Sequence, residues 1–130
     1  MVYRLKSPIL GFEQIKEVEF NESDELFATI SDASKSGLVW TLINPYRLRE
    51  YSFDLSADLQ KTLGINENSQ TLVYNVLALG QATDDSEINF LAPIVFNKDN
   101  ALAAQIVLDV KKYPNFGAAQ KLSEFVVKAQ

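Results

Sequence analysis

The sequence contains no cysteine and no histidine among its 130 residues. Without histidine there is no Ser-His-Asp triad and no imidazole base that could work near neutral pH. Without cysteine there is no disulfide frame, no Cys/His zinc site and no thiolate nucleophile. Glycine is also scarce: the five glycines are not clustered, so the Walker and Rossmann phosphate loops are absent. The chemistry that remains is that of carboxylate, lysine, tyrosine and hydroxyl groups, which disfavours an enzyme without excluding one.

Paired carboxylates are present but do not form a recognisable site. Adjacent acids occur at Asp24-Glu25 and Asp84-Asp85, and a further pair at Glu17 and Glu19. Glycoside hydrolysis requires two carboxylates held about 5–9 Å apart across a cleft, whereas neighbouring acids in loops are usually solvated. The spaced oxygen ligands and the glycine of an EF-hand loop are missing. We therefore expect no catalytic residue, no metal and no cofactor.

Long apolar runs are missing as well. No stretch approaches the eighteen or so apolar residues that a membrane-spanning helix requires, and residues 1–6 lack the apolar core of a secretory signal. Together with the absence of cysteine, this predicts a cytoplasmic protein that does not enter the membrane.

Acidic residues outnumber basic ones, 17 to 12, which gives a net charge of −5. This balance disfavours direct binding of nucleic acid through its phosphates. The charge is also unevenly distributed. Four lysines and one acid lie from Lys111 to the end, and between residues 13 and 32 a single base, Lys16, accompanies seven acids: Glu13, Glu17, Glu19, Glu22, Asp24, Glu25 and Asp32. Either the two ends pair internally, or the acidic end is offered to a basic partner.

The pattern of apolar residues predicts one mainly β domain over residues 1–130. Hydrophobic residues make up 47% of the chain, enough for a single core. The gaps between predicted strands are too short for crossover helices, so we expect a single domain with a mainly antiparallel sheet, either closed or sandwiched. The predicted strands cover residues 17–20, 37–43, 71–79, 88–96 and 101–110, and Pro93 inside the fourth marks an edge or a bulge.

Two helices are predicted. A short one near 57–63 has Ser56 as its N-cap and Gly64 at its end. The other covers residues 118–128, where Leu122, Phe125 and Val126 follow helical spacing.

Aromatic residues and arginines gather in the segment Asn44-Pro45-Tyr46-Arg47-Leu48-Arg49-Glu50-Tyr51. Both residue types are enriched at interface hot spots. In a domain of this size at least half of the aromatic residues must line the core. The segment is nevertheless the best candidate for an interaction surface, because it enters a loop and no structural requirement explains all of its residues.

Three blocks carry a resemblance to a known family. The first is Ile9-Leu10-Gly11-Phe12-Glu13. The second is Leu42-Ile43-Asn44-Pro45-Tyr46, followed by residues 55–64, and the third is residues 89–97, followed by Gln105-Ile106-Val107-Leu108. In this order and spacing the blocks resemble the flagellar assembly factor FliW family over nearly the whole chain. The sequence departs from that family where Leu10 replaces a proline, where Asn44 replaces an aspartate, and at residues 113–130, which form a C-terminal extension atypical of the family.

The resemblance implies a small cytoplasmic, antiparallel β-barrel-like protein that is not an enzyme and works by exchanging partners. Members of the family bind CsrA, an RNA-binding translational repressor, and keep it off flagellin messenger RNA. They also bind flagellin, so that accumulated flagellin frees CsrA and lowers flagellin translation. We hypothesise that the acidic stretch steers CsrA towards the protein. A second hypothesis is that a groove beside the loop at 44–51 accepts an apolar helix face of flagellin. The candidate partner-binding residues are Phe12, Glu13, Glu17, Glu19, Glu22, Asn44, Tyr46, Arg47, Leu48 and Tyr51.

Two alternatives remain open at this stage. A small-ligand-binding or carboxylate-based hydrolytic protein could use the interior of the barrel. A chaperone for flagellin without a regulatory role would differ from the first interpretation only in not binding CsrA.

Overall fold

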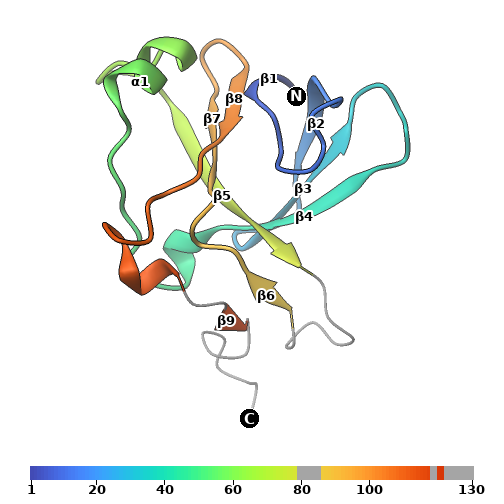
Figure 1. Ribbon diagram of the computed structural model, residues 1–130. Helices are drawn as coiled ribbons and strands as arrows, with labels where there is room; N and C mark the ends of the chain where they lie inside the picture. Colours follow the sequence, from blue (N-terminus) through green and yellow to red (C-terminus); the bar gives the residue numbers. More distant parts are fainter. Residues whose placement is uncertain (79–85, 118–119, 122–130) are drawn as a thin grey trace.

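The strands close into a barrel. The computed structural model describes residues 1–78, 86–117 and 120–121. Within these residues, neighbouring strands follow the order β4-β3-β2-β1-β8-β7-β5, and pairing of β4 with β5 completes the ring (Figure 1). The strands of the ring are β1 (Val2–Ser7), β2 (Glu17–Glu22), β3 (Phe27–Asp32), β4 (Val39–Ile43), β5 (Thr71–Ala78), β7 (Ile94–Asn97) and β8 (Leu102–Gln105).

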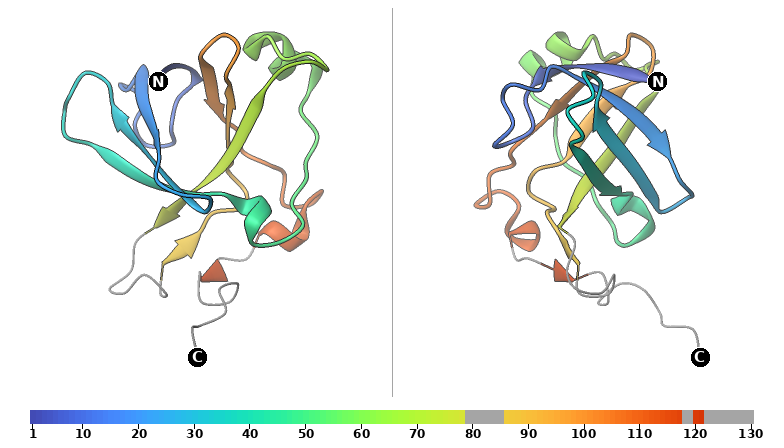
Figure 2. Two further views of the ribbon diagram at one scale, coloured as in Figure 1. Left: turned by 180° about the vertical axis from the view of Figure 1, so that it is seen from behind. Right: turned by 90° about the vertical axis from the view of Figure 1, so that its right-hand side faces the viewer.

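Short elements extend the ring at one end. The two-residue strand β6 (Glu87–Ile88) pairs with the end of β5, and β9 (Gln120–Lys121) pairs with β6. Figure 2 shows these two strands together beyond the barrel. The remaining elements are one α-helix, α1 (Ala57–Leu63), and two 3-10 helices, η1 (Pro45–Arg47) and η3 (Pro114–Phe116).

One pair of strands is parallel. Antiparallel pairing joins the other neighbours in the described residues, whereas β1 runs parallel to β8, with Arg4 opposite Leu102 and Leu5 opposite Ala103. The sequence analysis predicts the mainly β, barrel-like fold correctly, but its antiparallel description is wrong for this pair. No tight turn connects β1 to β8, so hairpin geometry does not impose an antiparallel direction on them.

The interior of the barrel contains a cluster of aromatic rings. Alternation along β2 directs Val18 and Phe20 inward and leaves Glu17 on the outside. The ring of Phe96 lies 5.0 Å from that of Tyr3, 5.1 Å from that of Phe20 and 6.3 Å from that of Tyr74, measured between centroids. These edge-to-face and tilted contacts connect β1, β2, β5 and β7 at the centre of the core.

The predicted strands at 17–20, 37–43 and 71–79 are confirmed, with shifted ends. The sequence analysis did not predict β1 or β3, because charged and polar side chains obscure the alternation there. A single strand over 88–96 is wrong: a turn at residues 90–92 separates β6 from β7, and Pro93 lies just before β7. The strand predicted over 101–110 is limited to β8, because Ile106 and Leu108 donate their backbone N–H groups to Pro93 and Leu91 outside any strand.

The short helix is confirmed at both ends. The Ser56 hydroxyl accepts a hydrogen bond from Leu59 N at 3.2 Å, and Gly64 ends the helix with φ of 66°. The C-terminal helix predicted over 118–128 is wrong at Gln120 and Lys121, which pair with β6 as a strand. The rest of that prediction lies outside the described residues.

Replacing Gly64 with alanine is expected to lower the free energy of unfolding by about 1–2 kcal/mol, because an L-residue at this positive φ is strained. The added Cβ would also lie 2.6 Å from Asn100 Nδ2, which donates to the carbonyl of Leu63 at the helix end. Denaturant unfolding measures the change. Gly11→Ala is the matched control, since its φ is +85° but nothing lies within 4 Å of the added Cβ. Equal losses in the two variants would show that the contact with Asn100 is unimportant.

Candidate partner-binding surfaces

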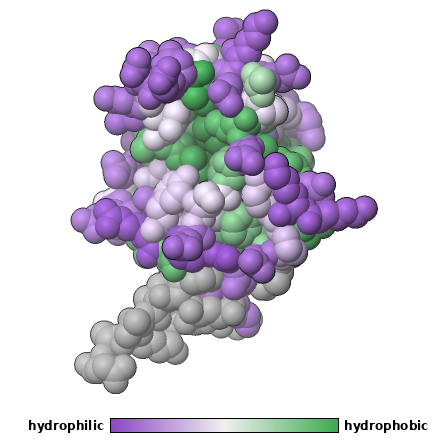
Figure 3. Space-filling model, turned by 90° about the vertical axis from the view of Figure 1, so that its left-hand side faces the viewer, coloured by the Kyte–Doolittle hydropathy of each residue, from purple (hydrophilic) through white to green (hydrophobic). Residues whose placement is uncertain are grey.

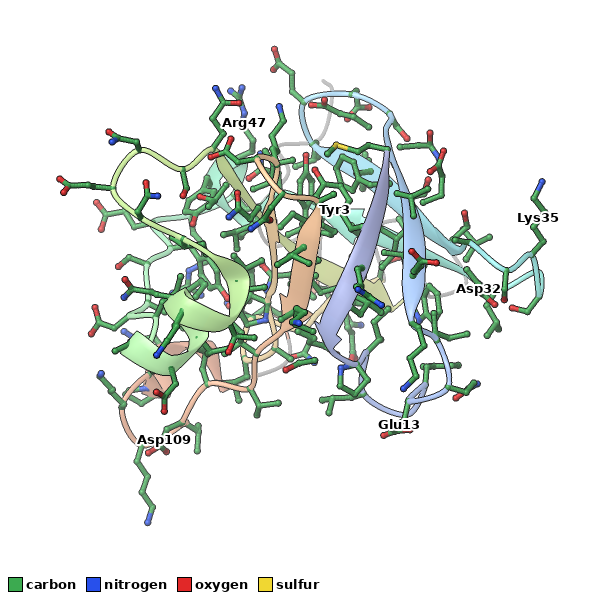
Figure 4. The ribbon with its side chains drawn as sticks, turned by 90° about the horizontal axis from the view of Figure 1, so that it is seen from above. Tyr3, Glu13, Asp32, Lys35, Arg47 and Asp109 are labelled. Carbon is green, nitrogen blue, oxygen red and sulfur yellow. The ribbon has the colours of Figure 1, made fainter. Side chains whose placement is uncertain are left out.

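The acidic residues of the front segment extend along β2 and the loops at its ends. Glu17 and Glu22 are exposed on the strand, and Glu19 is half-buried. Glu17 and Glu22 lie five positions apart along the strand, a span of about 17 Å. Alternation places Glu17 and Glu19 on the outer face and Glu22 on the face of Val18 and Phe20, at the end of the strand. Glu13 lies in the loop between β1 and β2, and Figure 4 shows it on the opposite side of the barrel from Arg47. The predicted acidic residues therefore form an elongated surface along one strand and not a compact cluster.

Two of the seven acids have structural roles in turns. Asp24 Oδ1 accepts hydrogen bonds from the backbone N–H groups of Leu26 and Phe27, both at 2.8 Å, which lower the pKa of Asp24. Hydrogen bonds from Ser36 and then from Ser34 likewise lower the pKa of Asp32, whose side chain is buried at the end of β3. The acids left for a partner are Glu13, Glu17, Glu19, Glu22 and Glu25.

The basic tail pairs with the middle of the chain. Lys112 Nζ lies 3.2 Å from Asp54 Oδ2, and Lys121 stands directly opposite Glu87 in the β6–β9 register. In the acidic segment, Glu19 lies 3.6 Å from the N-terminal amine and Glu25 lies 3.9 Å from Arg47. Of the two alternatives for the uneven charge, these contacts favour an acidic surface that Lys112 and Lys121 do not neutralise; Lys128 lies outside the described residues.

The segment 44–51 begins with a capped 3-10 turn that presents Tyr46 and Arg47 to solvent. Asn44 Oδ1 accepts from Tyr46 N at 3.0 Å, which begins η1, and Pro45 is buried at its first turn. Tyr46 is 54% exposed and Arg47 is exposed beside it. Leu48 is half-buried against the apolar cluster beneath. Tyr46, Arg47 and the visible edge of Leu48 form a small aromatic and basic surface, and Asn44 positions it.

The expectation that Tyr51 is an exposed contact residue is wrong, because its side chain is only 5% exposed. Its hydroxyl donates to the carbonyl of Phe90 and accepts from Asn75 Nδ2 at 3.2 Å. Burial, as the largest cause, raises the pKa of Tyr51 to about 12, so its hydroxyl stays protonated at neutral pH. The aromatic pattern of the sequence did not separate this core ring from the exposed Tyr46, since both lie in the same loop.

Phe12 lies at one end of the barrel and not beside the loop. Its ring contacts Trp40 edge to face at 5.1 Å between centroids. Both rings line a hollow of about 280 Å³, whose other lining residues are Ile9, Leu10, Val76, Asn89 and Gln105. Gln105 fastens the loop to the barrel, since its Oε1 accepts from Leu10 N at 2.7 Å. The sequence analysis did not find this hollow, because its residues come from five separate segments.

Arg49 is the residue of the loop whose role the sequence analysis missed. Its guanidinium carbon lies 5.1 Å from the ring centroid of Phe90 and 5.0 Å from that of Phe116. Its Nη1 donates to Gln120 Oε1 at 2.8 Å. The arginine therefore connects the loop to the C-terminal segment, and alternating arginines and tyrosines were the only sequence signal for it.

The described part of the chain contains no group of three or more acidic side chains placed to hold a metal ion. Within the same residues, no helix is long and apolar enough to cross a membrane.

The fold and these surfaces define a small closed β-barrel domain with an acidic strand and an aromatic loop. The family model described as "FliW protein" matches residues 1–116. The chain belongs to the FliW family.

Individual relatives agree with this assignment. The "Flagellar assembly factor FliW 1" of Wolinella succinogenes is 49% identical over 126 residues, which cover 97% of this chain and 98% of the relative. The protein of the same name from Helicobacter pylori (strain HPAG1) is 44% identical and covers 98% of this chain and 96% of its own length. A solved structure described as the crystal structure of the flagellar assembly factor FliW superposes with a TM-score of 0.83, at 25% identity, over 98% of this chain and 88% of that one.

Proposed function

We propose that this chain is a flagellar assembly factor that binds CsrA and flagellin and relieves CsrA repression of flagellin messenger RNA by partner exchange. It works in the cytoplasm through its surfaces and catalyses no reaction. Membership of the FliW family and relatives named as flagellar assembly factors support the first part of the proposal.

The observation that supports the exchange is the negative charge along β2, which lies on the outer face at Glu17 and Glu19 and at the exposed end of the strand at Glu22. A protein that binds RNA must present positive charge to the phosphates. Glu17, Glu19 and Glu22 place negative charge along about 17 Å of one strand, and Glu13 and Glu25 continue it into the adjoining loops. Such a surface attracts a basic partner and accelerates its association.

Titration of the purified protein with CsrA, with flagellin and with both tests the proposal. We expect binding to each partner alone, and we expect added flagellin to release CsrA from a preformed complex. Binding of flagellin without binding of CsrA would reduce the role to that of a chaperone. A thermal shift with small apolar molecules, together with no binding of either protein, would instead favour a ligand site in the hollow beside Phe12 and Trp40.

The exposed part of the loop is expected to contribute to flagellin binding. Replacing Tyr46 and Leu48 with alanine should weaken flagellin binding by at least about tenfold, because exposed tyrosines are frequent hot spots of binding and the half-buried Leu48 packs the loop that presents Tyr46. Calorimetric titration measures the change. The matched control is Val39→Ala, which removes an exposed apolar side chain from β4, away from the loop. Unchanged flagellin affinity in a folded double variant would remove the loop from the binding surface.

A further inference from the structure

The C-terminal segment covers an aromatic surface beside the loop. We call residues 112–117 with 120–121 the strap, and Tyr51, Phe53 and Phe90 the aromatic surface. Phe116 in the strap lies over Tyr51, with 4.7 Å between ring centroids, and 6.4 Å from Phe90. Tyr113 stacks on Phe116 with an interplanar angle of 7° and accepts a hydrogen bond from Asp54 N at 2.8 Å. The strap therefore occupies this surface with its own aromatic side chains.

Arg49 joins the strap to the loop that carries the candidate contact residues. Its guanidinium group lies between the rings of Phe90 and Phe116, and its Nη1 donates to the Asn115 carbonyl at 3.4 Å as well as to Gln120. Cation–π contacts of this kind attract the guanidinium group to both rings. A change in the loop at Arg49 therefore acts directly on the strap.

Among the described residues, the strap pairs with the rest of the sheet through fewer backbone positions than the barrel strands do. β9 pairs through two residues with β6, which itself pairs through two residues with β5. The ion pair between Lys112 and Asp54 joins side chains that are 59% and 84% exposed, so it adds little stability. Figure 3 shows the side of the molecule where α1 and residues 106–117 lie, with apolar surface bordered by hydrophilic side chains. Segments with few buried contacts open at lower free energy than the core.

We propose that the strap is an internal competitor for the partner that binds beside the loop. In the free protein, Phe116 occupies a position on the aromatic surface. When the strap leaves, an aromatic or aliphatic side chain from an amphipathic helix of the partner takes that position. This inference rests on the proposed function, in which that partner is flagellin. Binding of flagellin then uncovers Tyr51, Phe53 and Phe90. The closed strap lowers the affinity of the free protein for flagellin.

A reversible cross-link tests the proposal. Glu87 and Lys121 are direct neighbours across β6 and β9, and Cα atoms of such pairs lie about 4.5–5.5 Å apart, within the range of a disulfide. The chain contains no cysteine, so Glu87→Cys with Lys121→Cys can form only one intramolecular disulfide. The oxidised variant should bind flagellin at least about tenfold more weakly than the same protein after reduction. Equal affinities in the two states would overturn the proposal.

A second variant, Phe116→Ala, distinguishes a competitor from a purely structural residue, because the two roles predict different changes in flagellin affinity. Phe116→Ala should loosen the strap and tighten flagellin binding about threefold or more, because the competent state becomes more populated. If Phe116 only supports the fold, the same variant should weaken binding or leave it unchanged, and either result contradicts the proposal. Near-ultraviolet circular dichroism and thermal unfolding establish that the variant is folded.

Binding of CsrA serves as the internal control for the cross-link. Figures 1 and 2 show β2, which carries the acidic residues, on the opposite side of the barrel from the strap. Oxidation should therefore leave CsrA affinity unchanged, whereas a parallel loss for both partners would indicate general damage and overturn the inference. A wild-type protein that binds no flagellin overturns the proposed function itself. If the wild-type protein binds flagellin and the double-cysteine variant binds it equally in the oxidised and reduced states, only the competitor is overturned.

Discussion

Replacing Phe96 with alanine is expected to lower the free energy of unfolding by about 3–5 kcal/mol. The side chain is fully buried, and its ring contacts Tyr3, Phe20 and Tyr74 at the centre of the barrel. The substitution removes these contacts and leaves a cavity bounded by strands that cannot move together, because they are closed in a ring. Domains of this size have about 5–15 kcal/mol of total stability, so the substitution should remove between about a fifth and all of it.

Urea unfolding of wild type and variant measures this loss, provided that the slope with denaturant is the same. Phe96→Leu, which keeps most of the buried volume, should lose less than half as much. Val107→Ala, at a side chain 64% exposed just after β8, should change stability by less than about 0.5 kcal/mol. A loss below about 1 kcal/mol for Phe96→Ala would mean that the aromatic cluster is not the centre of the core.

Reversing the charge of Glu17, Glu19 and Glu22 to lysine is expected to slow association with CsrA by at least about tenfold at low salt. Each reversal changes the charge by two, so three reversals take the net charge from −5 to +1. Wild-type association should slow as salt rises, because screening weakens the attraction, whereas the variant should lose this dependence. Stopped-flow mixing at several salt concentrations gives both rates.

The matched control reverses three exposed acids elsewhere, Asp58, Glu67 and Asp99, and so reaches the same net charge. If the acids along β2 steer CsrA, the control should retain most of the wild-type rate. If both variants slow equally, net charge and not the placement of acids along β2 controls association. A wild-type rate that does not depend on salt would contradict electrostatic steering altogether.

The fold followed from the sequence where local signals were strong. The breaker pair at Asn44-Pro45 and the caps at Ser56 and Gly64 act within a few residues, and both the end of β4 and the helix appear where these residues place them. The run at 88–96 was misread because a continuous apolar segment does not reveal a turn inside it. The pairing of β1 with β8 depends on contacts about 98 residues apart in the sequence, which no local pattern encodes.

The candidate surfaces, like the fold, could be predicted only where a local pattern determines them. Acidic residues alternate along β2, so the outward direction of Glu17 follows from the period of a strand. The burial of Tyr51 could not be predicted in the same way, because it is set by Phe90, Asn75 and Phe116 from three other segments. For the same reason the role of Arg49 was visible only after the C-terminal segment had been placed beside it.

The parallel pairing of β1 with β8 also has a consequence for synthesis of the protein. β1 is complete once residue 7 has been made, but its second neighbour ends at Gln105. The ring therefore cannot close during translation until about four fifths of the chain exists, and a fold dominated by such distant pairings forms slowly. Until then, the edge of β1 that later pairs with β8 stays open. In a protein built in this way the barrel cannot close before Gln105 has been made, so the delay between the messenger RNA and the action of the protein includes a folding step that cannot begin early.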